Sequence, residues 1–249
     1  QEAENSSQVS LFGESAEIDL PEPIIPNSEE WPIMDKLSRE KEVVGIYISG
    51  HPLDDFKLEM EHLCTTGGLK LLQDQQAIKN KKMKFGGMLS EVQHRTTKKG
   101  KPFGMFNMED YEHNERFFLF GDDYVKFKDY LVNGWFIYLT GSVQPRKYAK
   151  TPDELEFKVT SIELLANVRD KKAKSLKLDV DLSMLNDHIV DGLVVLIEKY
   201  PGPCSVSLKI RDLDVQISMP SISKKVELSN EFIEELEAMK VFGYQISAK

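Results

Sequence analysis

The sequence predicts an α+β protein of several domains, in which a five-stranded β-barrel lies between a short helical connector and a small C-terminal α+β domain. Three observations indicate this class. Apolar residues recur at helical spacing over residues 31–78, and the spacing changes to alternation over about residues 84–165. Beyond residue 169, helical and alternating segments follow one another. The 249 residues suffice for two compact domains with connecting segments.

Residues 1–30 form an acidic segment, with eight Asp and Glu residues and no Lys or Arg. Such a segment cannot bury enough apolar surface to offset the entropy of ordering, so we expect a disordered arm. One apolar pentapeptide, residues 8–12, interrupts it. Leu11 and Phe12 have no local core to join, which favours a docking peptide over a chance cluster.

Residues 31–78 are expected to form the helical connector, with breaks at Gly45 and Gly50 and with a second helix starting at Pro52. A third short helix is expected over residues 69–77. His51 and the acids that follow Pro52 could suggest a metal or acid–base site. The same residues are typical of a helix start, and we favour that structural interpretation.

Residues 79–168 are expected to form the barrel. Alternating segments predict strands at residues 84–95, 102–110, 115–120, 135–143 and 155–165, with an amphipathic helix at residues 122–132. This order, three strands, a helix and two strands, is that of an OB-fold. In OB-folds the second and third strands and the adjoining loops bind oligonucleotides.

The candidate nucleic-acid site lies on the first hairpin and on the strands around it. Residues 79–101 carry eight basic residues against Glu91 alone, although the formal net charge of the chain is −9. Alternation would place aromatic and cationic side chains on one face, as base stacking and phosphate contact require. In the alternative interpretation the lysines are solvated turn residues and the phenylalanines are packed. Glu109 and the acidic net charge predict weak affinity. The candidate residues are Arg95, Lys98, Lys99, Lys101, Phe103, Arg116 and Phe118.

Residues 169–249 are expected to form the small α+β domain, entered through a basic hinge. Helices are predicted at residues 184–200 and 230–239, and strands at residues 205–210 and 214–219. The cations of the expected hinge are Arg169, Lys171, Lys172, Lys174 and Lys177.

Several classes of function are not indicated. The sequence shows no P-loop, dinucleotide fingerprint or nucleophile elbow, so we expect no catalytic residue, metal or cofactor. Cys64 and Cys204 lie 140 residues apart without a metal-binding spacing, which favours a reducing cytoplasm. No apolar run is long enough for a membrane span, and no signal peptide opens the chain. Because Gln1 precedes an acidic arm, we expect an interior fragment of a longer polypeptide.

Three motifs in one order resemble a single family. Residues 40–54 (EKEVVGIYISGHPLD) resemble the segment that precedes the OB domain of the bacterial DNA polymerase III alpha subunit. Residues 95–102, followed by residues 106–110, resemble the OB hairpin of that subunit, and residues 8–12 (QVSLF) resemble its sliding-clamp peptide. The resemblance covers about residues 6–168 well and rests beyond residue 169 on position and the α+β pattern.

The resemblance implies binding of single-stranded DNA by the barrel and docking of the sliding clamp through Gln8, Ser10, Leu11 and Phe12. It also implies contact between the C-terminal domain and the clamp-loader tau subunit. The family is a DNA-directed DNA polymerase, a transferase, whose catalytic aspartates lie far upstream, so the fragment itself is expected to be non-catalytic. Two alternatives stay open: a structural interaction module without nucleic-acid binding, and the anticodon-binding OB domain of an aminoacyl-tRNA synthetase.

Overall fold

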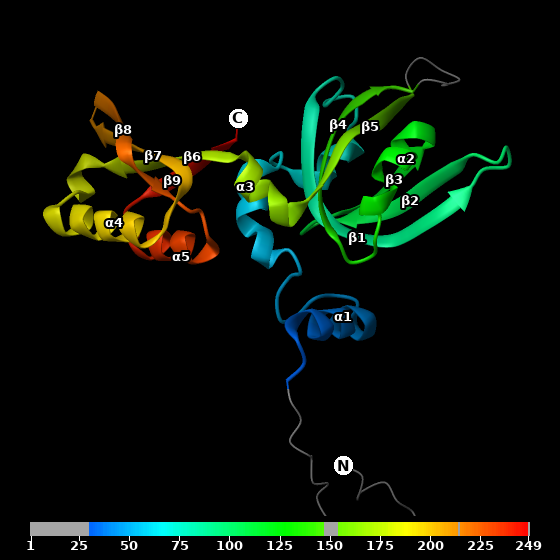
Figure 1. The fold of residues 1–249 in the computed structure, drawn as a ribbon, viewed down its shortest axis with the longest axis horizontal. Coiled ribbons are helices and arrows are strands. Elements are labelled where there is room, and N and C mark those ends of the chain that lie inside the picture. Colours follow the sequence, from blue (N-terminus) through cyan, green and yellow to red (C-terminus); the bar gives the residue numbers. More distant parts are fainter. Residues whose placement is uncertain (1–29, 147–153, 214, 249) are drawn as a thin grey trace, which may run out of the picture.

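The computed structural model describes residues 30–146, 154–213 and 215–248. Figure 1 shows two lobes, a curled sheet and a second sheet covered by helices, with the connector between them. The pentapeptide at residues 8–12 lies outside the described residues, as does the rest of the acidic segment up to residue 29.

The connector begins with α1 (Ile33–Val44), which ends at Gly45 in the left-handed conformation, as the sequence predicts. The expected second helix is present as a continuous helical segment over residues 54–63, which begins as the 3₁₀ helix η1 (Asp54–Phe56) and ends as the π-helix η2 (Glu59–Leu63). The expected third short helix is the 3₁₀ helix η3 (Gly68–Gln73), which follows the glycine pair at residues 67 and 68.

The barrel is a five-stranded sheet in the order β3-β2-β1-β4-β5. Phe117 of β3 packs edge-on against Phe157 of β5, with 5.9 Å between ring centroids, so the two outer strands of the sheet meet. This is the predicted OB-fold. Its strands are β1 (Lys82–Thr96), β2 (Pro102–Glu109), β3 (Asn114–Phe120), β4 (Phe136–Pro145) and β5 (Leu155–Leu164).

The predicted barrel helix is divided into α2 (Gly121–Phe127) and the 3₁₀ turn η4 (Lys128–Tyr130). Phe127 and Leu131 from this segment are buried in the barrel core. The segment packs directly on β2 at Gly104, where an added Cβ would lie 2.7 Å from Leu131 and 2.9 Å from Tyr124. Glycine at this position therefore lets the helix close one side of the barrel.

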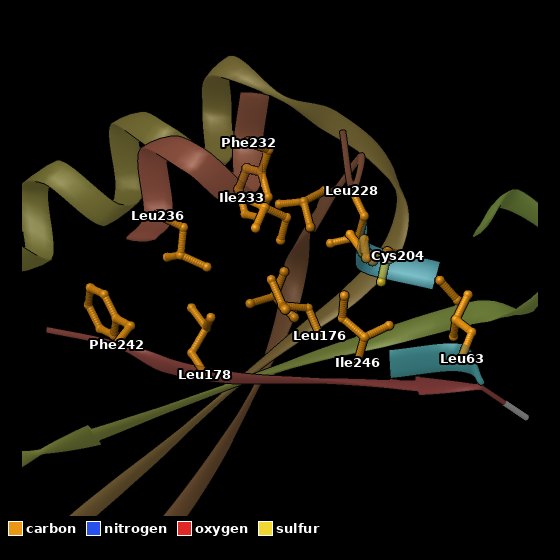
Figure 2. Close-up of a cluster of buried hydrophobic side chains, with 14 of the residues drawn as sticks. Leu63, Leu176, Leu178, Cys204, Leu228, Phe232, Ile233, Leu236, Phe242 and Ile246 are labelled. Atoms are coloured by element: carbon orange, nitrogen blue, oxygen red, sulfur yellow. The ribbon is translucent and has the colours of Figure 1, made fainter. Parts of the chain in front are cut away.

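The C-terminal unit is a four-stranded sheet in the order β8-β7-β6-β9, with β6 and β7 parallel. Helices α4 and α5 lie on one face of it, where the side chains labelled in Figure 2 form the core. Its elements are η5 (Leu165–Asn167), α3 (Val168–Lys172), β6 (Ala173–Asp181), η6 (Leu182–Met184), α4 (Asp187–Lys199), β7 (Pro201–Asp212), β8 (Val215–Val226), α5 (Asn230–Ala238) and β9 (Gly243–Ala248).

The expected basic hinge is wrong. Its residues form α3 and most of β6, which pairs on both sides and lies inside the sheet. Leu176 and Leu178 point into the core, while Lys177 and Asp179 lie on the opposite face of the strand. The lysines of this segment are therefore the polar face of a strand, and the two lobes are not joined by a flexible basic linker.

One apolar cluster connects the connector, the barrel and the C-terminal unit. Leu63 of the connector lies with Leu176 and Ile246 of the C-terminal sheet (Figure 2). Tyr138 of β4 joins the same cluster, and its hydroxyl donates a 2.8 Å hydrogen bond to the carbonyl oxygen of Leu63. Because these groups pack together, we expect the two lobes to move as one body.

Both cysteines are free thiols. Burial raises the pKa of the Cys64 thiol to about 12 and also raises the pKa of Cys204. Burial that raises the pKa of a thiol disfavours the reactive thiolate, so the structure does not indicate a nucleophilic role for either cysteine.

Candidate nucleic-acid interface

The candidate interface is the outer face of β1, β2 and β3, and strand register defines its rows. Arg95 pairs with Phe103, and Phe103 pairs with Phe120. Side chains at paired positions project from the same face of a sheet, so a cation and two aromatic rings share one row. The opposite parity carries the barrel core, including the fully buried Phe106. The predicted division into an inner and an outer face is therefore correct.

The aromatic rings of this face form a continuous group. Phe103 and Phe120 stack across the strands with centroids 5.3 Å apart and planes inclined by 21°. Phe118 lies 6.2 Å from Phe120 with the two planes inclined by only 7°. Phe118 and Phe120 remain 49% and 54% exposed, so the alternative in which Phe118 is packed is wrong. Flat exposed rings of this kind can stack with nucleic-acid bases.

Phe118 and Phe120 also line a groove of about 740 Å³ between β3 and β5. Arg146, at the end of β4, lines the same groove with a half-exposed guanidinium group. Phe120 and Arg146 are absent from the predicted set. Phe120 has the same parity as Phe118, so the alternation on β3 already contained the signal. Arg146 lies beside Phe118 and Phe120 only because β3 and β5 meet when the barrel closes, and local sequence spacing does not predict this contact.

The loop between β1 and β2 carries the predicted lysines, and Lys98, Lys99 and Lys101 are all exposed. The loop is ordered by a 2.8 Å hydrogen bond from the Thr97 backbone nitrogen to the Lys101 carbonyl oxygen and by Gly100, which has a φ of 75°. None of the three lysines has an ion pair with a described residue. Their charges are therefore available at the end of the face that carries Arg95 and the ring of Phe103.

At the opposite end of the face, at the end of β2, the negative charge of Glu109 is neutralised by a neighbouring lysine. Glu109 forms an ion pair with Lys41 of α1, and the Lys41 ammonium group also lies 4.4 Å from the ring centroid of Tyr47. Partial burial disfavours the charged amine, but the Glu109 carboxylate outweighs it and holds the pKa of Lys41 above its ordinary value. Glu109 thus repels phosphate less than its position in the sequence suggests.

His51 has a structural environment. Its backbone nitrogen donates to the Asp54 carboxylate at 2.6 Å, and its Nδ1 accepts from the Leu53 backbone nitrogen at 3.1 Å. Burial lowers the pKa of the imidazole, which packs 4.6 Å from the Tyr111 ring. These contacts stabilise the start of the helical segment at η1, which agrees with the interpretation of His51 as part of a helix start. Within the described ranges, no group of three or more His, Cys, Asp or Glu residues is placed to hold a metal ion.

Comparison with known proteins assigns a class to each lobe. Residues 84–165 match the family model of an OB-fold nucleic acid binding domain. Residues 176–247 match the C-terminal domain of the DNA polymerase III alpha subunit. The first match therefore falls in the barrel and the second in the C-terminal unit. No helix in the described part of the chain is long and apolar enough to cross a membrane.

The chain is similar to the DNA polymerase III alpha subunit over most of its length. It is 26% identical to that of Bacillus subtilis over 219 residues, 88% of this chain and 19% of the relative. Identity to the Escherichia coli K12 subunit is 24%, over 77% of this chain and 16% of the relative. Identity to the Treponema pallidum subunit is 36%, over 43% of this chain and 9% of the relative. The predicted resemblance to the C-terminal region of this polymerase is confirmed, and the chain spans less than a fifth of these relatives.

Proposed function

We propose that this chain is the non-catalytic C-terminal part of a replicative DNA polymerase and that its barrel binds single-stranded DNA. The row of Arg95, Phe103 and Phe120, continued by Phe118, is the observation that supports this most. Aromatic rings in a line with cations suit a flexible strand, whose bases stack while its phosphates meet positive charge. The acidic composition supports weak binding, and an interface made of rings and cations supports binding without strong sequence preference.

Replacing Lys98, Lys99 and Lys101 together by alanine is expected to weaken binding of single-stranded DNA and to flatten its salt dependence. Each lost phosphate contact removes about 0.7 from the slope of log affinity against log salt, so the slope should fall by up to about 2. Fluorescence anisotropy with a labelled oligothymidylate at several salt concentrations measures both quantities.

The matched control removes the same charge from the C-terminal unit, through Lys174→Ala, Lys225→Ala and Lys240→Ala. These three lysines are exposed and have no ion pair with a described residue. If the two triple variants bind alike, the β1–β2 loop is not the phosphate site. Tighter binding of tRNA than of DNA would favour the anticodon-binding alternative, and no binding by the parent chain would favour a structural module.

We also propose that residues 8–12 dock in the pocket of a sliding clamp. Burial of Leu11 and Phe12 is worth about 1.5–3 kcal/mol each. Ordering several residues costs about 1–2 kcal/mol apiece, so we expect roughly micromolar affinity. Calorimetry with the clamp should show that Leu11→Ala with Phe12→Ala abolishes binding, while Gln8→Ala weakens it and Val9→Ala changes it little. Equal affinity of parent and double variant would reduce the motif to a chance pentapeptide.

The C-terminal unit is proposed to contact the clamp-loader tau subunit. The match of residues 176–247 to the C-terminal domain of the polymerase supports this assignment. Titration of the chain with purified tau should give a complex. The variant of the three loop lysines and the Leu11 and Phe12 variant should both retain it, since neither alters this unit. Failure of the parent chain to form a complex would remove tau from the proposal.

The chain is proposed to lack polymerase activity of its own. Its relatives in Bacillus subtilis and Escherichia coli are polymerases, but less than a fifth of their length is represented in this chain. Template-dependent incorporation of nucleotides by the purified chain with magnesium would contradict the proposal, provided that a chain purified from a second host retains the activity.

A further inference from the structure

Glu91 occupies an unusual backbone position on the candidate interface. It has a φ of 50°, a left-handed conformation that favours glycine, and it lies where the register between β1 and β2 shifts between Ser90 and Gln93. The Asn133 side chain stabilises this bulge by accepting a 2.8 Å hydrogen bond from the Val92 backbone nitrogen. The bulge takes the Glu91 side chain out of the regular alternation and directs it towards β2 and β3.

The Glu91 carboxylate is held by two strands. Its Oε2 atom accepts hydrogen bonds from Arg116 Nη2 at 2.7 Å and from Asn107 Nδ2 at 2.8 Å. Arg116 Nε in turn donates to Asn107 Oδ1 at 2.8 Å, which closes a three-residue network. Asn107 is nearly buried, whereas the side chains of Glu91 and Arg116 are 58% and 49% exposed. The ion pair therefore faces the solvent on the proposed DNA face.

Arg116 differs from the other predicted cations, Arg95 and the three loop lysines, in its electrostatic state. Arg95 and the three loop lysines have no carboxylate partner among the described residues. Arg116 carries one at hydrogen-bond distance, so its attraction for a phosphate is largely cancelled. A phosphate that approached Arg116 would also meet the negative charge of Glu91. The interface thus contains a cation next to Phe118 that its own neighbour neutralises.

We propose that Glu91 limits the affinity of this face for single-stranded nucleic acid by neutralising Arg116. This inference rests on the proposed function of the barrel. With Glu91 ionised, a bound strand is held by the loop lysines, Arg95 and the aromatic rings alone. Removal of the Glu91 charge adds Arg116 as one more phosphate ligand.

Glu91→Gln is expected to raise the affinity for an oligothymidylate about three- to fivefold, the range that an exposed ion pair can supply. It should also steepen the salt slope by about 0.7, the amount expected for one added phosphate contact. The control Asp129→Asn removes one exposed carboxylate from η4, away from the network, and is expected to change neither quantity. Unchanged affinity of Glu91→Gln would overturn the proposal, and so would lower affinity, which would mean that Glu91 positions Arg116 for binding.

A double-mutant cycle with Arg116→Met separates release of Arg116 from simple loss of negative charge. The gain from Glu91→Gln is expected to vanish when Arg116 is methionine. An equal gain in both backgrounds would contradict the proposal. Glu91→Gly provides a second test, because glycine tolerates the left-handed backbone; it should match Glu91→Gln in affinity without a lower melting temperature.

A direct measurement keeps failure of this inference distinct from failure of the proposed function. The Arg116 Nε–H resonance should shift in Glu91→Gln without DNA and shift again when oligothymidylate is added. A shift on mutation with no response to DNA, together with no binding by any variant, would reject the DNA function. DNA binding by the parent chain with no response of the Arg116 resonance in either protein would reject the role of Glu91 alone.

Discussion

Arg169→Ala is expected to lower the free energy of unfolding by about 3–5 kcal/mol, the usual cost of leaving a buried charge without its partner. The carboxylate of Glu59 is only 2% exposed and accepts two hydrogen bonds from Arg169, from Nε at 2.7 Å and from Nη2 at 2.9 Å. Arg169 Nη1 also donates to the Leu228 carbonyl oxygen at 3.1 Å. The guanidinium group thus ties α3 to the connector and to the segment before α5.

The matched control for this prediction is Lys171→Ala, two residues further along α3. The Lys171 side chain is 60% exposed and lies 4.0 Å from Glu163, so its loss should cost less than about 1 kcal/mol. Urea denaturation followed by far-UV circular dichroism measures both variants. A cost for Arg169→Ala as small as that for Lys171→Ala would show that water or rearrangement compensates Glu59.

Replacing both Phe118 and Phe120 by alanine is expected to reduce the affinity for single-stranded DNA at least about thirtyfold. A stacked base is worth about 1–3 kcal/mol, and the two exposed rings can serve two bases. The salt slope should stay unchanged because stacking releases no counterions, in contrast to the loop-lysine variant. Fluorescence anisotropy at several salt concentrations distinguishes the two kinds of loss.

Val125→Ala is the control for the aromatic pair, because Val125 is an apolar residue of similar exposure on α2. It should leave DNA affinity and thermal stability unchanged. If the aromatic double variant binds as the parent does, the rings of β3 are not the stacking surface.

Much of the barrel could be predicted because its strands are half-buried. On β2 and β3 the alternation of buried and exposed positions, such as Phe117 inside and Phe118 outside, appears directly in the sequence. Strand β6 has the same alternation over residues 173–181, with Leu176 and Leu178 buried. Its lysines led to the wrong prediction of a basic hinge. For this segment, the alternation of apolar residues indicates the secondary structure better than the number of basic residues does.

The network around Arg116 could not be predicted in the same way. The alternation on β3 predicts Arg116 as a residue of the nucleic-acid groove, but its partner Glu91 lies 25 residues away and reaches it only through a bulge with a left-handed residue. The Arg169 and Glu59 pair spans 110 residues. Local spacing indicates which face a side chain occupies, but charge pairing across elements depends on register and on backbone irregularities.

The apolar cluster that joins Leu63, Tyr138 and Ile246 has a mechanical consequence. A partner that binds and turns the C-terminal unit would turn the barrel with it, because the connector packs against both sheets. The direction in which the barrel presents its aromatic rings would then be set by the orientation of that distant partner. If the barrel binds single-stranded DNA as proposed, the orientation of such a partner would also set the direction in which the DNA approaches the barrel.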